Sequence, residues 1–348
     1  MDIRFSRLEE RGRLTRFIHE HWKADHPLVL DPALMDWQYR NEQAGHDHFV
    51  VAVQPSGELE GVLGFIPTSQ FDPSLTVNPD IWLSIWKVKE GSRSAGLGMQ
   101  LLSYLMSEVN PRSIAALGIS EVARSIYRLM GYTTGKLRHF YMLHPNLRSF
   151  QLASGISDED RRSMQNESSQ ERVQLIRCEE SSFLSGVDHG LVATTGAIPH
   201  KTRTYFRQRY FRHPSYRYDT YAIVREEAPQ GFIVMRTAKH QTSRAIRIVD
   251  YIGREEAWIG LGPCLQQLLL DSGAEYVDFY QHGMQEQIIR QAGFQKRDGD
   301  RSVIIPNYFE PFSQENVELE FAYKQSSDRP YYLFKGDSDQ DRPNQIGR

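Results

Sequence analysis

Apolar runs separated by Gly- or Pro-bearing turns divide the chain into two similar halves. In the first half, HFVVAV and GVLGFI flank the turn PSGELE, and in the second half TYAIV and GFIVMR flank REEAPQ. Such runs on either side of a turn predict paired strands. A longer predicted strand follows in each half, at Ile81–Val88 and at Ala245–Ile252.

The elements after these long strands also occur twice and in the same order. Each strand leads into a Gly-rich stretch and an apolar helical run, SAGLGMQLLSYLM and WIGLGPCLQQLLL. A buried strand follows, Ser113–Ser120 in the first half and YVDFY in the second. A short helix then ends at Gly131-Tyr132 or at Gly293-Phe294, and glycine after the last helical residue is a common helix stop. Agreement over so many elements predicts a tandem repeat.

The predicted fold class is α/β, with two tandem mixed β-sheets, flanking helices and a degenerate second copy. A length of 348 residues suits two domains. We assign residues 1–150 to an N-terminal domain that holds the ligand site and residues 172–335 to a C-terminal domain. Residues 151–171 are polar and predict a linker, and residues 336–348 predict a polar, extended tail.

Composition excludes several classes of protein. The formal net charge of −3 disfavours a nucleic-acid partner, which would need a basic excess. Two cysteines, Cys178 and Cys264, make neither a CxxC pair nor a disulfide framework. No signal-peptide pattern opens the chain, and no apolar run reaches the ~18 residues that cross a bilayer. We therefore expect a cytoplasmic protein with no membrane partner, and the sequence leaves a homodimer open.

The Gly-rich stretch after the first long strand favours a diphosphate ligand. Between Trp86 and Leu102 a strand ends, a turn with Arg93, Gly96 and Gly98 follows, and an apolar helix begins. Glycines allow close approach to the backbone, and the free N–H groups of a helix N-terminus attract anions. The stretch lacks the third glycine of a dinucleotide-binding fingerprint and the Gly-Lys-Ser/Thr of a P-loop.

The segment Arg93-Ser94-Ala95-Gly96-Leu97-Gly98 resembles the R/Q-x-x-G-x-G/A turn of the GNAT acyltransferases. In that family the turn follows the fourth strand, and a helix with a tyrosine follows about 30 residues later. The segment from Ala123 to Tyr132 fits that helix, with Tyr127 four residues before Gly131. The resemblance covers residues 1–145 well and residues 172–312 as a degenerate copy.

This resemblance implies acetyl-CoA or another acyl-CoA as co-substrate and no metal. It places the diphosphate on the turn amides, the pantetheine along the fourth strand and the thioester in a gap between strands four and five. The implied cofactor-binding residues are Trp86, Val88, Arg93, Ser94, Ala95, Gly96, Leu97, Gly98 and Ser125. Tyr127 takes the place of the acid that protonates the leaving thiolate.

Residues for the acceptor are less defined by the pattern. The candidates are Ser84, Ser120, His282, Asp337 and Asp339. Ser120 suits a helix cap equally well. The D-x-D-x-D spacing of the C-terminal segment lacks the glycine and glutamate of an EF-hand, so its carboxylates suit an amine or a sugar hydroxyl better than calcium.

Two further patterns are interpreted as non-functional. Glu90 precedes the turn, and we interpret it as a solvated charge in preference to a catalytic base. In the second half Gly260-Leu261-Gly262 is kept, but Ala257 stands at the arginine position and Ile289 at the tyrosine position. We expect the second unit not to catalyse, and either to complete the acceptor pocket or to pack against the first unit.

The predicted function is an acyl-CoA-dependent N-acyltransferase that acts on a primary amine of a small molecule. Resemblance to tandem GNAT proteins of bacterial surface-polysaccharide pathways favours a nucleotide-linked amino sugar. One alternative is a tRNA-dependent aminoacyl transferase with paired GNAT folds, which should lack the turn and carry a basic surface. The other is a module that binds CoA or another ligand without catalysis.

Overall fold

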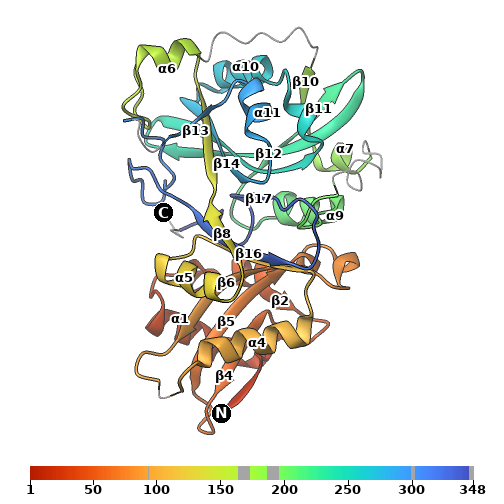
Figure 1. The fold of residues 1–348 in the computed structure, drawn as a ribbon, viewed down its shortest axis with the longest axis vertical. Helices are drawn as coiled ribbons and strands as arrows, with labels where there is room; N and C mark the ends of the chain where they lie inside the picture. The colour runs from red at the N-terminus through yellow and green to blue at the C-terminus, as the bar shows by residue number, and fades with distance from the viewer. Residues whose placement is uncertain (93, 164–172, 186–195, 299–301, 345–348) are drawn as a thin grey trace.

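The computed structural model describes residues 1–92, 94–163, 173–185, 196–298 and 302–344. Figure 1 shows two units stacked along the long axis of the molecule, with the N-terminal unit at one end and the second unit at the other. Each unit is a twisted sheet with helices packed on it. This architecture confirms the predicted α/β fold class with two mixed sheets.

The first sheet has seven strands in the described residues. Their spatial order is β1 (Asp2–Phe5), β4 (Phe49–Val53), β5 (Leu59–Pro67), β6 (Asp80–Val88), β7 (Ser113–Leu117), β16 (Glu320–Gln325) and β8 (Thr133–Lys136). A separate small hairpin pairs β2 (Arg40–Asn41) with β3 (His46–Asp47).

The second sheet has eight described strands. Seven lie in the order β10 (Val173–Cys178), β11 (Asp219–Arg225), β12 (Ala228–His240), β13 (Ser243–Gly253), β14 (Tyr276–His282), β9 (Arg138–Leu143) and β15 (Gln295–Lys296). The eighth, β17 (Leu333–Phe334), pairs with the end of β14.

Helices cover the sheets and fill the connections. Those of the first unit are α1 (Arg11–His21), α2 (Pro27–Leu30), α3 (Pro32–Tyr39), α4 (Leu97–Val109) and α5 (Glu121–Leu129). Those that follow are α6 (Asp158–Ser163), α7 (Glu180–Ser185), α9 (Arg203–Phe206), α10 (Gly262–Ser272) and α11 (Glu286–Gln291). Shorter helical turns are η1 (Leu8–Glu10), η2 (Thr68–Gln70), η3 (Pro73–Leu75), the π-helical η4 (Arg207–Phe211) and η5 (Glu255–Trp258). No described helix is long and apolar enough to cross a bilayer.

One parallel strand pair occurs at the same place in each sheet. β6 runs parallel to β7 across the connection that contains α4, and β13 runs parallel to β14 across the connection that contains α10. A parallel pair requires such a crossover, whereas the antiparallel neighbours need only short turns. The shared succession of elements agrees with the duplicated pattern in the sequence.

The two units exchange strands. β9 lies within residues 1–150 but pairs with β14 and β15 of the second sheet. β16 comes from the C-terminal part of the chain and lies between β7 and β8 of the first sheet. Each sheet is therefore completed by a strand from the other half, so residues 1–150 do not contain the whole first sheet.

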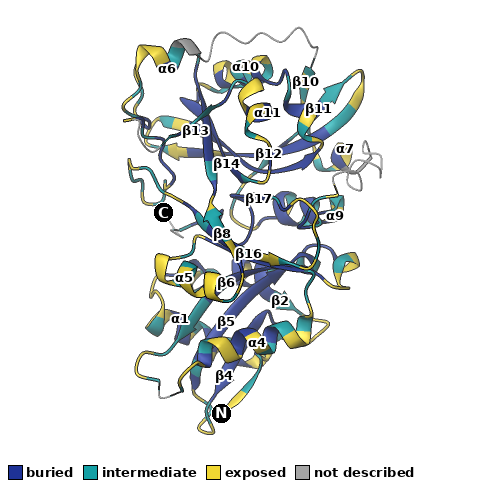
Figure 2. Ribbon diagram, viewed as in Figure 1, coloured by how far each residue is buried: buried dark blue, intermediate teal, exposed yellow. Residues whose placement is uncertain are grey.

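A continuous apolar core joins the units. One cluster of buried residues contains Phe71 and Trp82 from the first unit together with Tyr205 and Phe206 from the second. In Figure 2 the strands are largely buried, and the exposed residues gather on the outer faces of helices such as α4, α5 and α10. The units therefore stabilise one another through this shared cluster, and each also has a core cluster of its own.

The C-terminal segment corrects one expectation. Residues 336–348 are predicted to form a polar, extended tail, but Asp337, Ser338 and Asp341 are buried, as is the preceding Lys335. Residues 345–348 of this predicted tail lie outside the described part of the chain. The charges of the two aspartates are compensated inside the protein, since Asp337 pairs with Lys201 at 2.7 Å and Asp341 with Arg236 at 2.8 Å. The sequence showed the polarity of this segment but not the partners that allow its burial. The expected linker at residues 151–171 includes the short helix α6, and its residues 164–171 lie outside the described part of the chain.

We predict that Lys201→Met destabilises the protein strongly. The Lys201 amino group lies 2.8 Å from Asp250 and 2.7 Å from Asp337, and both carboxylates are fully buried. Removing the cation leaves two buried charges without compensation, which costs about 3–5 kcal/mol. Arg177→Met is the control, because its pair with Asp219 is exposed and should cost less than about 1 kcal/mol. Equal urea midpoints for the two variants would contradict the structure.

We also predict that stability falls as the pH drops from 7 to 5. Burial lowers the pKa of His26, His139 and His282 to about 4, and that of His48 and His213 to about 3. In the unfolded chain histidine has a pKa of about 6.5, so below this pH the unfolded chain binds more protons than the folded protein. The free energy of unfolding should fall by at least about 2 kcal/mol between pH 7 and pH 5. A free energy that stays constant over this window in urea titrations would disprove the burial of these rings.

Candidate active site

The centre of the first sheet contains a gap between two parallel strands. β6 and β7 pair from Asp80 and Ser113 as far as Leu83 and Ala116, and the pairing then stops. The rest of β6, as far as Val88, pairs with β5 on its other side only. In the described part of the chain, the β6 edge from Ser84 to Val88 therefore presents unpaired backbone groups to the gap. An extended, amide-containing ligand can bind such an edge as a further strand.

An irregularity in β6 marks the start of the gap. The register between β5 and β6 shifts between Leu63 and Phe65, so that β6 has one extra residue at this point. Such a bulge bends its strand and redirects its side chains. Ser84 lies in this bulge, and its hydroxyl accepts a hydrogen bond from the Tyr39 hydroxyl at 2.9 Å. The backbone of Ser84, proposed from sequence to contact substrate, thus lies at the start of the gap, whereas its hydroxyl lies against Tyr39 and Gly64.

The Gly-rich turn lies beyond the end of β6 and opens α4. Gly96 caps the helix with φ of 73°, and a Cβ atom there would meet open space. Within the described residues, the N–H groups of Gly98 and Met99 make no hydrogen bond. Free amides at a helix N-terminus attract an anion such as a diphosphate. This turn also contains Ser94, Ala95 and Leu97, whereas Arg93 lies outside the described residues.

The end of β6, the turn and α5 meet at one point. A Cβ atom on Gly98 would lie 3.0 Å from Nε1 of Trp86, so glycine permits the turn to pack on this indole. The Trp86 ring lies 5.8 Å from the Tyr127 ring of α5. The structure therefore brings together three residues that the sequence placed at one site. Val88 lies at the end of the same strand, opposite Gly61.

Tyr127 has the electrostatics of a neutral proton donor. It is buried, and its ring lies 5.0 Å from that of Tyr132. Burial, followed by the nearby Tyr132, raises the pKa of Tyr127 well above its usual value. The phenol therefore keeps its proton at neutral pH, as an acid must before it protonates a leaving group.

Three polar residues near α5 and the turn have local structural partners. The Ser120 hydroxyl caps α5 by accepting the amide of Ala123 at 3.2 Å, so the capping interpretation is confirmed. The Ser125 hydroxyl donates to the carbonyl of Glu121 at 3.1 Å on the exposed side of the helix. Glu90 is exposed and pairs with Lys87, as expected for a solvated charge.

The C-terminal segment reaches the gap, which the sequence could not show. The Ser338 hydroxyl donates to the carbonyl of Leu83, and the Gln340 amide donates to the carbonyl of Leu117, both at 3.1 Å. Asp339 lies between these two anchors, with Arg342 at 3.4 Å. Of the two aspartates proposed from sequence, Asp339 is therefore brought to the gap. Asp337 is held away from it by the buried pair with Lys201.

His26 is a polar residue of this region that sequence reasoning missed. It is 1% exposed, its Nδ1 accepts the amide of Leu28 at 3.3 Å, and its Nε2 has no partner among the described residues. Burial lowers the pKa of His26 to about 4, with Arg342 adding to the shift and Asp339 opposing it. The ring is therefore neutral and lies within electrostatic range of the C-terminal segment.

His282 lies elsewhere, at the junction of the two sheets. It ends β14 opposite Leu333, and its ring packs on Phe321 of β16 at 4.4 Å. Burial lowers the pKa of His282 to about 4, so the ring is neutral. Across the described residues, no three His, Cys, Asp or Glu side chains form a group that could hold a metal ion.

The corresponding gap in the second sheet is filled by the chain itself. β13 and β14 pair only from Ile246–Ile248 and Val277–Phe279, and β17 then pairs with the end of β14. The amide of Gly336 donates to the carbonyl of Val249 at 2.7 Å, which extends this contact to β13. A ligand cannot take the place of a strand that is already present.

The last glycine of the second Gly-rich turn is covered by the chain. A Cβ atom on Gly262, at the start of α10, would lie only 3.1 Å from the carbonyl oxygen of Ala292. The end of α11 therefore packs on the start of α10. Ala257 and Ile289, the two departures from the motif, are both buried in the apolar core of this unit.

Solved structures share this architecture. A GCN5-related N-acetyltransferase from Anabaena variabilis ATCC 29413 matches with a TM-score of 0.56 over 94% of this chain and 73% of its own, at 11% identity. A conserved protein of unknown function from Enterococcus faecalis V583 matches with a TM-score of 0.53 over 93% of this chain and 72% of its own, at 9% identity. A GCN5-related N-acetyltransferase from Kribbella flavida matches with a TM-score of 0.50 over 93% of this chain and 71% of its own, at 14% identity. No model of a known protein family and no curated protein matches the sequence. The chain therefore has the fold of GCN5-related N-acetyltransferases.

We predict that Gly96→Ala weakens CoA binding. The positive φ of Gly96 costs a residue with a Cβ atom about 1–2 kcal/mol, and relief of this strain would rotate the amides of the turn. The Kd of CoA should rise about tenfold in a calorimetric titration. Gly273→Ala is the matched control, because Gly273 has φ of 64°, the same open surroundings and a place at the far end of α10. Equal CoA affinity in the two variants would exclude the turn as the binding site.

Proposed function

We propose that the chain is an acyl-CoA-dependent N-acyltransferase whose single working site is the gap between β6 and β7. One observation supports this proposal above all. The unpaired edge of β6 leads directly to a helix N-terminus with free amides at Gly98 and Met99. A pantetheine arm has amide groups that suit the strand edge, and the diphosphate of CoA suits the helix N-terminus.

The reaction would transfer an acyl group, with acetyl as the first candidate, from sulfur to nitrogen. The neutral amine attacks the thioester carbon, the C–S bond breaks and an amide forms. A backbone N–H on the β6 edge near Trp86–Val88 would stabilise the developing oxyanion. The Tyr127 phenol would donate its proton to the leaving thiolate and regain one from solvent, while the amine nitrogen loses its proton to solvent or to a base.

The acceptor would be a primary amine of a small molecule, with a nucleotide-linked amino sugar as the leading candidate. The C-terminal segment supports a small acceptor, because Ser338 and Gln340 anchor it to both strands of the gap and so limit the space there. The net charge of −3 gives no support to a tRNA-bound donor. The second unit would not catalyse, since β17 fills its gap. The enzyme would be cytoplasmic, and the absence of a basic excess supports the lack of a nucleic-acid partner.

The proposal predicts that the full chain binds acetyl-CoA and releases free thiol in the presence of an amine. Tyr127→Phe should lower kcat about 100-fold and leave the Kd of acetyl-CoA unchanged, because it removes the acid and keeps the ring. Thiol release over a panel of amines measures turnover, and a thermal-shift titration measures binding.

Tyr132→Phe is the control for this variant. Its ring packs against that of Tyr127, and it should leave kcat unaltered. Equal losses of acetyl-CoA affinity and turnover in Tyr127→Phe would contradict the role as acid. Wild-type protein that shows no thermal shift at millimolar acetyl-CoA would contradict the whole proposal.

A further inference from the structure

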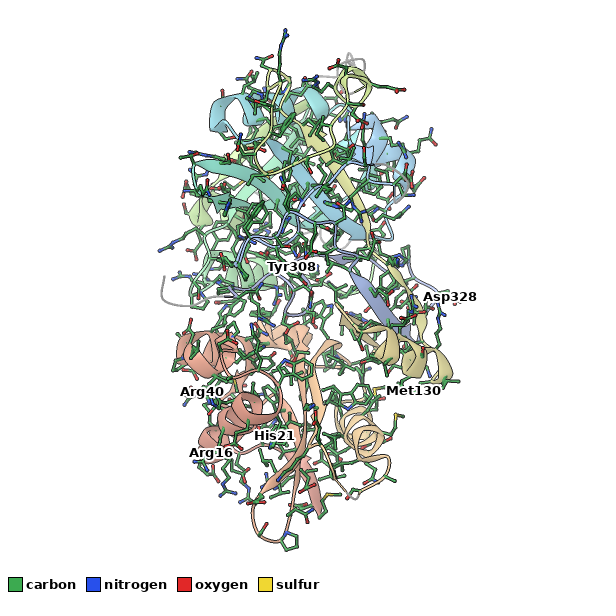
Figure 3. The ribbon with its side chains drawn as sticks, turned by 90° about the vertical axis from the view of Figure 1, so that its left-hand side faces the viewer. Arg16, His21, Arg40, Met130, Tyr308 and Asp328 are labelled. Atoms are coloured by element: carbon green, nitrogen blue, oxygen red, sulfur yellow. The ribbon has the colours of Figure 1, made fainter. Side chains whose placement is uncertain are left out.

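A small polar pocket lies at the waist of the molecule, between the second sheet and the C-terminal segment. Its volume of about 20 Å³ suits a water molecule or the oxygen atoms of one small group. Figure 3 shows Tyr308, one of its lining residues, between the two units. Four cations line it, Arg236, Arg247, Lys335 and Arg342, together with the amides of Asn307 and Gln340 and the carboxylates of Asp341 and Glu310.

The side chain of Asn307 lacks partners. Asn307 is 3% exposed, and neither Nδ2 nor Oδ1 has a hydrogen-bond partner among the described residues. Its backbone is held firmly, because Arg247 donates to its carbonyl oxygen at 2.6 Å. A buried amide is normally paired, since an unpaired one is destabilising. This amide therefore has capacity for a group that enters the pocket.

Lys335 is a buried cation without a counter-ion. It is 3% exposed, and among the described residues no carboxylate oxygen lies within 4.0 Å of its amino group. The ring of Tyr280 lies 5.7 Å away. A buried charge is normally paired, and lysine is costly to bury when it is not.

The charges around Lys335 contribute to the lowered pKa of its amino group. Arg247 of β13 and Arg236 of β12 repel it, whereas Asp341 and Asp278 attract it but are already paired with these two arginines. Burial, followed by Arg247, lowers the pKa of Lys335 to about 7. An anion in the pocket would supply the missing charge and favour the protonated amine.

The pocket adjoins the proposed active site. Gln340 lines it and also donates to the carbonyl of Leu117, where β7 has already separated from β6. Arg342 lines it as well and contacts Asp339, which lies at the gap. A molecule held in the pocket by one end could therefore reach the gap with its other end.

We propose that this pocket binds a carboxylate or phosphate oxygen group of the acyl acceptor through Lys335, Asn307 and Arg342. The acceptor is then an anionic amine, with its anionic group in the pocket and its amine at the gap between β6 and β7. The part that concerns the acceptor rests on the proposed function. Anion binding at the pocket does not require it.

A binding experiment tests the pocket without turnover. Sulfate and acetate are titrated calorimetrically into the full chain at pH 6 and pH 8, where the charge of both anions is constant. Wild type should bind at least one of them, more tightly at pH 6, with uptake of a proton by Lys335. Lys335→Met and Asn307→Leu should each weaken this binding about tenfold. Preference for sulfate over acetate, or the reverse, separates phosphate-like from carboxylate recognition.

Asn316→Leu is the matched control, because both amide atoms of Asn316 are already bonded within the protein, to Ile305 and Val303. It should lose stability and keep anion binding, whereas Asn307→Leu should keep stability and lose binding. Unaltered anion affinity in Lys335→Met, or no binding of either anion by wild type, would overturn the proposal.

A turnover experiment tests the link to the acceptor. Thiol release from acetyl-CoA is compared for glucosamine and glucosamine 6-phosphate, and for 3-aminopropanol and β-alanine. The anionic member of at least one pair should have the higher kcat/KM, and Lys335→Met should remove that advantage. Equal use of both members by wild type would overturn the acceptor assignment. No thiol release from any amine, with anion binding intact, would instead refute the proposed function.

Discussion

The separation of β6 from β7 is the constraint on which the rest of the structure depends. Beyond Leu83 and Ala116 the two strands no longer pair, so one strand edge in the middle of a sheet has no neighbour. An unpaired edge inside a domain must be satisfied by another segment, by water or by a ligand. The helix N-terminus at Gly96–Gly98 lies at the end of this edge and favours a ligand with a diphosphate.

The C-terminal segment gives the two units different roles. In the second sheet, β17 and Gly336 occupy the gap between β13 and β14, so that this gap becomes part of the core. In the first sheet, Ser338 and Gln340 bond only to Leu83 and Leu117, where the strands begin to separate. One segment therefore closes the second gap and lines the first. Buried ion pairs with Lys201 and Arg236 hold the C-terminal segment in place, so it forms a rigid side of the site.

Local patterns in the sequence predicted the helices and strands. The pairing of strands between the two halves and the burial of the C-terminal segment depend on long-range contacts, which local patterns do not show. Apolar runs on either side of a turn predicted β4 and β5, a longer apolar run predicted β6, and the glycines at 96 and 98 predicted an open helix start. The exchange of β9 and β16 left no local signal, because strands look alike whichever sheet they join. The burial of Asp337 and Asp341 depends on Lys201 and Arg236, more than 100 residues away. His26 could not be found from sequence, since its importance lies in an unpaired Nε2.

Hydrogen–deuterium exchange with and without CoA tests the central claim most directly. If CoA binds along the edge of β6 and at the start of α4, backbone amides between Ser84 and Met99 should exchange more slowly when CoA is present. The corresponding amides of the second unit, between Val249 and Gly262, should not change. Slower exchange in the second unit alone, or no change in either unit at saturating CoA, would contradict the account.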